Sequence, residues 1–439
     1  MRVLTADEAK RTVLRRRPAS ETELAPSARK RTAEVLGAEV SASEAVRRII
    51  RDVRAEGDAA VRRYCEAFDG VPHTALEVPR EAIDRSLTEI EPELKAALEF
   101  AAARIQRYHE TQAKHVVTSY EEGGLGIRVR PLETVGFYVP GTFPVYPSSV
   151  LHTLVPAKVA GVSTLVMVSP ADKSGRVPAV KLAAAAIAGV DRVFMASGAQ
   201  AIAALAYGTE SVPRVDKVCG PGNIFVTLAK REVFGDVGID SIYGPTETVV
   251  VADGEADPVL CAVDLIAQAE HDEMATPLLI TDSRALAEKV AAEVEARLAD
   301  LPRGAVARAA IENQGGAVVA ASMEEAVALA SDFAPEHLCI LAKDARRLAG
   351  LVKNAGGIFI GESSPEAIGD YTGGPSHVMP TGGAARFASP LSVMDFLKFS
   401  TVMEVRDEDV MALGPAGARI AYAEGLAGHA RAIEERLPK

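Results

Sequence analysis

Short apolar runs alternate with helical stretches through the middle of the chain, and this alternation constrains the fold more than any other feature. Runs such as 164–169 are continuously apolar, which is typical of strands buried on both faces. Because helical periodicity follows each run, the pattern predicts βαβ units and a parallel sheet covered by helices. The predicted strands are 134–139, 164–169, 192–196 and 217–219, and the predicted helices are 180–188, 199–207 and 224–233.

A second alternation of the same kind begins at residue 248. Asp257 and Pro258 form an N-cap and first-turn pair for a helix that runs to about residue 270. Two such blocks predict an α/β protein with two Rossmann-like domains and a cleft between them. The further strands are expected at 248–252, 278–281, 317–319, 338–341 and 357–360, and the further helices at 284–301, 323–331 and 345–354.

The two ends of the chain have helical periodicity. Ser43 is the predicted N-cap of a helical stretch over 43–68 that is broken near Gly57, and 92–109 is a second helix. Residues 123–130 are expected to connect into the strand at 134. The expected division is an N-terminal helical segment at 1–34, a first α/β domain at 35–136 and 247–390, a second at 137–246, and a small helical C-terminal appendage at 391–439.

Composition and charge exclude several classes of protein. A chain of 439 residues with a net charge of −12 lacks the basic face that a nucleic-acid surface needs. The four cysteines form no CxxC pair, so we expect reduced thiols in a cytoplasmic protein. No apolar run approaches the roughly 18 residues of a membrane span. Three arginines at 15–17 are not followed by the apolar core of a signal peptide.

Half of the eight histidines stand near a carboxylate or an amide in the C-terminal part of the chain. Zinc takes imidazole and carboxylate ligands, and an adjacent Glu–His pair can move protons. The cluster therefore predicts a metal-assisted enzyme. Its members are Gln268 and His271, Glu336 and His337, Asp370 and His377, and Glu424 and His429.

Some of these residues also fit an ordinary structural role. Asp264, Gln268 and His271 recur at i, i+4 and i+7, which is also the pattern of a solvated helix face. Glu336 and His337 begin a strand at its amino end, whereas sites in open α/β sheets favour the carboxyl ends. They could therefore be an ordinary surface pair.

The remaining members differ in how strongly they indicate function. Asp370 and His377 lie among glycines that let a backbone approach a ligand, beside apolar and aromatic neighbours, and this favours a functional loop. His429 stands near the start of a final helix at 428–437, where a histidine is usually structural or solvated. Cys339 could act as a nucleophile, but its setting, LCIL, is typical of a strand interior.

The evidence for a nucleotide site is indirect. No GxGxxG follows any predicted strand, so the standard dinucleotide motif is absent. The segments SGAQAIAAL (197–205) and CGPGNIFV (219–226) do place small residues between a strand and a helix start. Helix N-termini have free N–H groups that suit phosphates, so both segments are candidates for a nucleotide.

Several segments together resemble the histidinol dehydrogenase family. In chain order from about Gly136 to His429 they include FYVPGTFPVYPSSVL, PAKVAGV, GAQAIAAL, CGPGNIFV, IAQAEHD, APEHL, GDYTGGPSHVMPTGGAARF and LSVMDFLKFSTV, with weaker similarity before them. The resemblance implies the last two steps of histidine biosynthesis, in which L-histidinol is oxidised to L-histidine by NAD through an enzyme-held aldehyde. It also implies a cytoplasmic homodimer whose C-terminal part reaches the partner's site.

The same resemblance implies roles for individual residues. Zinc would position the substrate, His337 would be the general base on the alcohol, and Glu336 would activate the water that hydrates the aldehyde. The implied zinc ligands, which with His337 also contact the substrate, are Gln268, His271, Asp370 and His429. The other implied contacts are Thr246, His377 and Glu424 for the substrate, and Tyr138, Gln200 and Asn223 for NAD.

The chain departs from the family pattern at a few positions. It has GPTE where GPSE is common, so that Thr246 replaces a serine, and Tyr243 is bulkier than the small residue often seen there. The segment VPGTFPVYPSS also differs from the usual VPGG. One alternative is therefore a relative that oxidises another small alcohol, such as a sulfonated diol. Another is a zinc hydrolase using Glu336, although no HExxH is present.

Overall fold

The computed structural model describes residues 1–16, 26–141 and 144–437. It divides into two compact units, the first formed by Met1–Lys114 and Leu132–Phe396 and the second by His115–Pro131 and Leu397–Lys439. Two parts of the sequence interpretation lie outside the described residues. They are Thr142 and Phe143, where the chain departs from the family pattern, and residues 17–25 of the predicted N-terminal helical segment.

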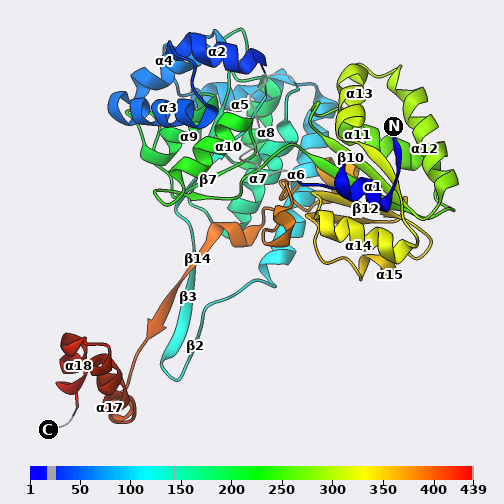
Figure 1. The fold of residues 1–439 in the computed structure, drawn as a ribbon. Coiled ribbons are helices and arrows are strands. Elements are labelled where there is room, and N and C mark those ends of the chain that lie inside the picture. The colour runs from blue at the N-terminus through cyan, green and yellow to red at the C-terminus, as the bar shows by residue number, and fades with distance from the viewer. Residues whose placement is uncertain (17–25, 142–143, 438–439) are drawn as a thin grey trace. The chain divides into compact units, whose positions relative to one another are not determined.

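The first unit, of which β7 and the helices α7 to α10 are labelled in Figure 1, contains a five-stranded parallel sheet. It is here called the β4 sheet and has the strand order β6-β5-β4-β7-β8. The order reverses between β4 and β7, which makes their carboxyl ends a topological switch point. The strands and helices predicted between residues 134 and 233 are confirmed to within one residue at each end. The strands are β4 (Thr134–Tyr138), β5 (Thr164–Ser169), β6 (Arg192–Met195), β7 (Lys217–Cys219) and β8 (Gly238–Ile239), and the helices are α7 (Pro147–Ala160), α8 (Ala179–Ala188), α9 (Gly198–Tyr207) and α10 (Ile224–Val233).

The second sheet of this unit, the β9 sheet, is also parallel and has the order β1-β11-β10-β9-β12-β13. Its last five strands repeat the winding order of the β4 sheet, so the predicted pair of Rossmann-like α/β folds is confirmed. The strands are β1 (Val3–Thr5), β9 (Glu247–Ala252), β10 (Thr276–Thr281), β11 (Gly316–Val319), β12 (His337–Leu341) and β13 (Gly357–Ile360), and the helices are α11 (Pro258–Ala269), α12 (Arg284–Leu298), α13 (Gly304–Asn313), α14 (Met323–Phe333), α15 (Ala345–Ala349) and α16 (Glu366–Ile368).

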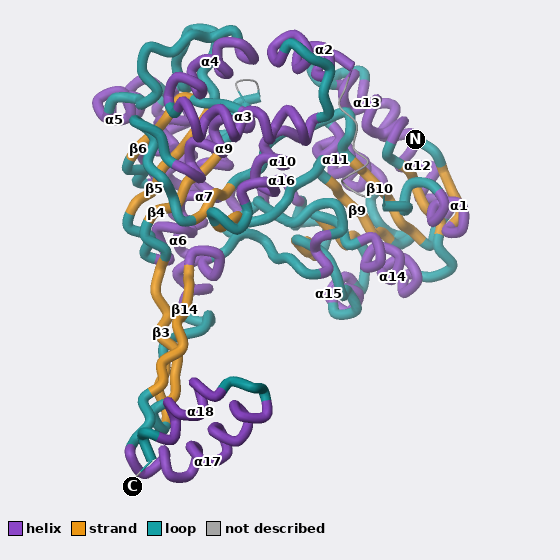
Figure 2. The backbone as a smooth tube through the Cα atoms, turned by 60° about the vertical axis from the view of Figure 1, so that its left-hand side comes forward, coloured by secondary structure: helices purple, strands orange, loops and turns teal. Residues whose placement is uncertain are grey.

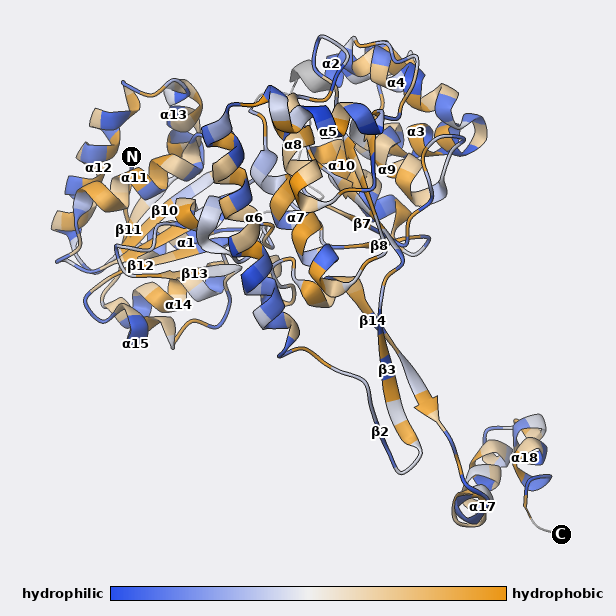
Figure 3. Ribbon diagram, turned by 180° about the vertical axis from the view of Figure 1, so that it is seen from behind, coloured by the Kyte–Doolittle hydropathy of each residue, from blue (hydrophilic) through white to orange (hydrophobic). Residues whose placement is uncertain are grey.

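The β9 sheet is buried on both faces. In β9 itself, Val250 and Ala252 join the core on one face, and Val249 and Val251 join the core on the other. Alternate residues of a strand point to opposite faces, so a continuously apolar strand needs helices on both sides. Figure 3 shows apolar colouring on β10 and β12, the two strands that flank β9. The same burial brings the polar start of β9 and β12 into a low-dielectric environment.

The helices within residues 35–136 were predicted to join the β9 sheet, but they share the cores of the β4 sheet instead. Ile49 and Val53 of α3 pack with residues of α9 and α10, and α5 and α6 contact α8 and α7 (Figure 1). An apolar helix stripe shows that a face is buried but not which sheet covers it. The helices on the β4 sheet side are α2 (Pro26–Leu36), α3 (Ala42–Glu56), α4 (Asp58–Asp69), α5 (Arg80–Glu89) and α6 (Pro92–Ala113). The short helix α1 (Ala6–Arg11) packs on the β9 sheet, where Ala9 joins the core.

Two further details near the N-terminus differ from the prediction. Ser41, not Ser43, caps α3, and its side chain accepts from the backbone N–H of Glu44. Residues 3–5, expected to be helical, form β1, because their backbone pairs with β11. Three residues are too few for periodicity to distinguish strand from helix.

The second unit contains an antiparallel sheet that the sequence did not predict. Its strands, with the order β14-β3-β2, are β2 (Tyr120–Glu122), β3 (Leu125–Pro131) and β14 (Leu397–Met403), followed by α17 (Asp407–Ala423) and α18 (Ala427–Glu434) (Figure 2). The predicted connection at 123–130 is therefore wrong, and the appendage is not wholly helical. Strands β3 and β14 are largely exposed, so they lack the apolar run that marks a buried strand. No helix among the described residues has the length and apolar character needed to cross a membrane.

Candidate functional site

Glu336 and His337 stand where the chain turns into β12. Helix α14 ends at Phe333, Ala334 takes a left-handed conformation with φ 53° and ψ 64°, and Pro335 follows. His337 is the first residue of β12, opposite Thr248 of β9 and Gly357 of β13. The pair therefore lies at the amino ends of the central strands, as predicted, and not at the carboxyl edge that α/β folds favour.

Glu336 is 8% exposed and its carboxylate is bound from the start of β9. Oε2 accepts a hydrogen bond of 2.5 Å from the hydroxyl of Thr246 and one of 3.1 Å from the backbone N–H of Glu247. Burial raises the pKa of Glu336, while the imidazole of His337 and the two donors act in the opposite direction. A carboxylate with a raised pKa is a better proton acceptor for a water molecule.

His337 is 3% exposed and is held through one ring nitrogen. Nδ1 lies 2.7 Å from the amide nitrogen of Gln268 and 3.2 Å from the carbonyl oxygen of Glu247. Nε2 lies 3.5 Å from Oδ1 of Asp370 and has no hydrogen-bond partner among the described residues. Burial opposes a charge on this ring, but the carboxylates of Glu336 and Asp370 outweigh it and raise the pKa of His337.

Asp370 lies in a π-helical turn, η2 (Gly369–Gly373), a geometry that occurs often at functional sites. Burial would raise its pKa, but the imidazole of His337 lowers the pKa of Asp370 to about 2. The Asp370 carbonyl oxygen lies 2.9 Å from Nδ1 of His377, and the hydroxyl of Ser149 lies 3.1 Å from Nε2. Nδ1 must donate to that carbonyl, so Nε2 of the neutral ring accepts from Ser149. The turn thus brings the main chain of Asp370 to the ring of His377.

Helix α11 carries Gln268 and places His271 just beyond its end. Asp264 and Gln268 are 8% and 2% exposed, so the alternative of a solvated helix face does not hold for them. Burial raises the pKa of Asp264 to about 6. His271 keeps an exposed surface, although protein atoms around its ring lower its pKa against the opposing carboxylate of Asp370.

The residues predicted to contact NAD lie near the carboxyl ends of the β4 sheet. Tyr138 ends β4, and its hydroxyl accepts a 3.3 Å hydrogen bond from the N–H of Gly198 at the start of α9. Asn223 caps α10 through its side chain. Gln200 is 1% exposed, and its amide donates to Ser197 at 3.2 Å. Tyr138 and Asn223 thus flank the β4–β7 switch point where α/β folds bind nucleotides.

Glycine is required beside this switch point. Gly220 has φ +111°, and a Cβ there would lie 2.2 Å from the carbonyl oxygen of Tyr138. Lys230 and Asp240 form a buried ion pair that supports the same loop. Lys230 donates to the Gly220 carbonyl at 3.0 Å, and Asp240 accepts from the Gly220 N–H at 2.7 Å. The loop after β7 is therefore fixed close to β4.

The donor set of the first unit fits a zinc ion by its chemistry. Asp370 offers a carboxylate of low pKa, His271 a neutral imidazole, and Gln268 an amide oxygen, because its amide nitrogen faces His337. No group of three or more His, Cys, Asp or Glu side chains arranged to hold a metal occurs in the described part of the chain. Of the zinc ligands predicted in this unit, only His271 and Asp370 are of those residue types, because Gln268 is an amide.

Glu424 and His429 belong to the second unit. Glu424 follows the last residue of α17, and His429 lies in the first turn of α18. Both side chains are exposed. Both are therefore available to a ligand.

Sequence reasoning missed three polar residues that shape the site. The backbone of Glu247 contacts both Glu336 and His337. Glu366 is 1% exposed and accepts a 2.6 Å hydrogen bond from Thr248, and burial raises its pKa to about 8. Ser149 binds His377. Glu247 follows the GPT segment directly, so a carboxylate at the start of a buried strand was the available signal.

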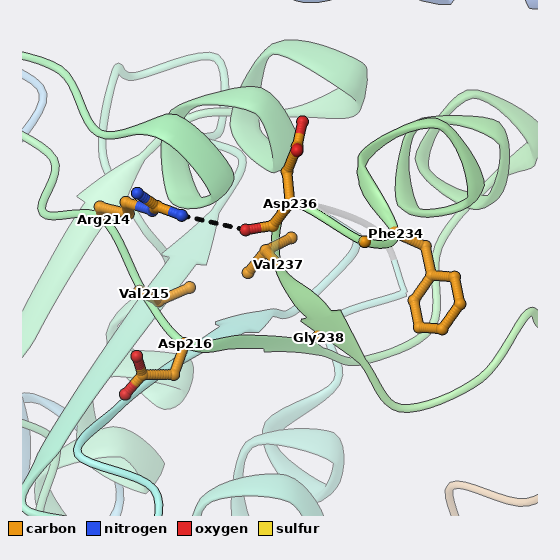
Figure 4. A pocket seen from close by; sticks show the side chains of 8 residues that line it. Arg214, Val215, Asp216, Phe234, Asp236, Val237 and Gly238 are labelled. Atoms are coloured by element: carbon orange, nitrogen blue, oxygen red, sulfur yellow. Dashed lines mark hydrogen bonds between the residues drawn. The ribbon is translucent and has the colours of Figure 1, made fainter. Parts of the chain in front are cut away.

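A surface pocket elsewhere holds none of the predicted residues. It lies at β8, where Arg214 donates a 3.0 Å hydrogen bond to the carbonyl of Asp236 (Figure 4). It contains no acid–base pair, so it does not compete with the site around Glu336.

Comparison with known proteins decides the family. The family profile described as histidinol dehydrogenase matches residues 33–437. The chain belongs to the histidinol dehydrogenase family. The resemblance noted in the sequence is thereby confirmed, as is the prediction that the chain is an oxidoreductase.

Individual members of the histidinol dehydrogenase family match over nearly the whole chain. The histidinol dehydrogenase of Deinococcus radiodurans is 48% identical over 410 residues, covering 93% of each chain. That of Dehalococcoides mccartyi is 47% identical over 398 residues, covering 91% of each. The crystal structure of histidinol dehydrogenase from Elizabethkingia anophelis matches with a TM-score of 0.89 at 31% identity, over 99% of this chain and 98% of that one.

Proposed function

We propose that this enzyme oxidises L-histidinol to L-histidine in two NAD-linked steps through an enzyme-held aldehyde, the last two steps of histidine biosynthesis. Family membership supports the substrate. The observation that carries the chemistry is the buried pair of Glu336 and His337, held side by side next to Gln268 and Asp370. One site with two proton acceptors can serve two successive oxidations.

In both oxidations His337 acts as general base. Its Nε2 has no hydrogen-bond partner among the described residues and faces Asp370, so it is the nitrogen open to the substrate hydroxyl. The carboxylates of Glu336 and Asp370 stabilise the imidazolium that forms when the ring takes up that proton. As the proton leaves, the C–H electron pair departs as hydride, for which bound NAD would supply the acceptor in each step.

Glu336 serves the step between the two oxidations. An aldehyde cannot lose a hydride to give an acid until water adds to its carbonyl carbon. Glu336 removes a proton from that water, and the buried carboxylate has the raised pKa that this role needs. The hydrate is then oxidised with His337 as base, so the two-step reaction consumes one water and transfers two hydrides.

Zinc would be held by Gln268, His271 and Asp370 together with His429 of the partner subunit. Zinc is redox-silent and supplies a Lewis-acid centre that positions the substrate. Thr246, His377 and Glu424 would complete the substrate contacts, and Tyr138, Gln200 and Asn223 would contact NAD. The proposal therefore includes a cytoplasmic homodimer with shared active sites that binds neither nucleic acid nor a membrane.

The decisive test measures NADH formation. Purified enzyme with L-histidinol and NAD should produce close to two NADH per histidinol. The NADH is measured by its near-ultraviolet absorbance. Enzyme stripped of metal, as shown by elemental analysis, should lose this turnover and recover it with zinc. No turnover of histidinol, with turnover of a sulfonated diol, would support the alternative substrate, and full activity of the metal-free enzyme would exclude the zinc site.

The hydroxyl at position 246 provides a further test, because it binds Glu336. Thr246→Ser keeps that hydroxyl and should change kcat/KM for histidinol by less than about tenfold. Thr246→Val keeps the shape but leaves a buried carboxylate oxygen with one donor fewer, so it should cost about tenfold or more. Steady-state kinetics of both variants would check this, and a Val variant equal to wild type would show that the hydroxyl has no role.

A further inference from the structure

The main chain of Glu247 holds both proton acceptors at once. Its N–H donates to Oε2 of Glu336 at 3.1 Å, and its carbonyl oxygen lies 3.2 Å from Nδ1 of His337. A shift of this one residue would therefore move both groups. What fixes Glu247 is thus a question about the whole site.

The side chain of Glu247 is 6% exposed and is bound by Arg16, which follows α1 near the N-terminus. Both terminal nitrogens of the guanidinium reach the carboxylate, Nη2 at 2.8 Å from Oε2 and Nη1 close to Oε1. The N–H of Gly382 adds a 3.1 Å hydrogen bond to Oε1. A buried carboxylate needs such a partner, and a two-pronged guanidinium pair fixes its orientation as well as its charge.

The same guanidinium holds the turn that leads to Glu336. Nε donates to the carbonyl oxygen of Phe333 at 3.0 Å, and Nη2 donates to those of Phe333 at 2.6 Å and Ala334 at 3.2 Å. Its central carbon lies 3.6 Å from the centroid of the Phe333 ring. Arg16 therefore ties the end of α14 to the start of β9.

This turn is strained. Ala334 is the one non-glycine residue with positive φ in the described part of the chain. A side chain in that region persists only when its surroundings hold it there, and such strain is common beside functional groups. Two residues later the chain reaches Glu336, so the strained turn sets the direction in which that carboxylate points.

We infer that Arg16 is a positioning residue for the reaction. By clamping Glu247 and the Phe333–Ala334 turn together, it orients Glu336 and His337 through their contacts with the Glu247 main chain. Lysine could supply the charge but not five donors in a rigid fork, so the geometry requires arginine. The inference rests on the proposed function, since it assigns Arg16 to the same acid–base pair.

The test compares Arg16→Gln and Arg16→Lys with Arg15→Gln, a matched control at an exposed neighbour. Histidinol and the aldehyde are supplied separately to the holoenzyme. Arg16→Gln should lower kcat for both substrates by about tenfold or more, because small misplacement of catalytic groups is costly. Arg16→Lys should be intermediate and Arg15→Gln unchanged. The KM for NAD and the bound zinc should stay within about twofold of wild type.

A purely structural role would give a different result. If Arg16→Gln lowered the melting temperature but kept kcat, or lowered kcat together with zinc content and NAD affinity, the positioning role would be excluded. If Arg16→Gln failed to fold, Arg16→Lys would carry the test. A kcat of Arg16→Lys equal to that of wild type would then exclude the positioning role. Wild-type enzyme without histidinol turnover would overturn the proposed function, whereas wild-type kinetics in both Arg16 variants would overturn only the inference.

Discussion

Glu336→Gln is expected to oxidise L-histidinol to the aldehyde but to lose oxidation of the aldehyde by about 10²- to 10⁴-fold, the range over which general base catalysis contributes. Only the second oxidation needs water to be activated. Glutamine keeps the shape and can still meet Thr246 and the Glu247 backbone, which now bind Glu336. The measurement is single-turnover NADH formation with each substrate supplied alone.

The matched variant is His337→Asn, which should slow both oxidations to a similar extent. Glu336→Gln also removes a carboxylate 3.7 Å from Nδ1 of His337, which lowers the pKa of that ring. A modest loss in alcohol oxidation is therefore expected as well. Equal losses for the two substrates in Glu336→Gln would contradict the division of labour between the two residues.

His271→Ala and His429→Ala enzymes should each be inactive and should regain activity when they are refolded together. If each site takes His271 from one chain and His429 from the other, a mixed dimer has one doubly damaged site and one intact site. Random pairing at equal concentrations makes half the dimers mixed, so about a quarter of the wild-type activity should return. Bound zinc should return in the same proportion.

The control is each variant refolded alone, which should stay inactive. Mixed dimers can be confirmed by mass when one variant carries a cleavable tag. If every ligand came from a single chain, all sites in the mixture would remain damaged. No recovery despite confirmed mixed dimers would therefore exclude the shared-site proposal.

The buried strands were predictable because burial on both faces leaves a continuous apolar run. Strand 164–169 was located to the residue, and 217–219 and 357–360 were as well. Exposed or very short strands leave no such record. Val3–Thr5 pairs with residues more than 300 positions away, and residues 128–131 of β3 pair only with β14, more than 200 positions away, which local periodicity cannot show.

The site was predictable where side chains form compact motifs. Gln268 and Asp370 lie in such motifs, and the structure brings both to His337. Main-chain contacts and long-range ion pairs carry no motif. The carbonyl of Glu247 and the guanidinium of Arg16 act through backbone geometry, so their roles emerge only from the fold.

The antiparallel sheet of the second unit also affects how the protein can be made. Strand β3 ends at residue 131, and its partner β14 begins at residue 397. At translation rates of roughly 5 to 20 residues per second, about 13 to 50 seconds pass between synthesis of the two strands. During that interval β3 has β2 on one edge and an open edge on the other. Nascent chains therefore present a strand edge that stays unpaired until β14 is made and that other chains could occupy.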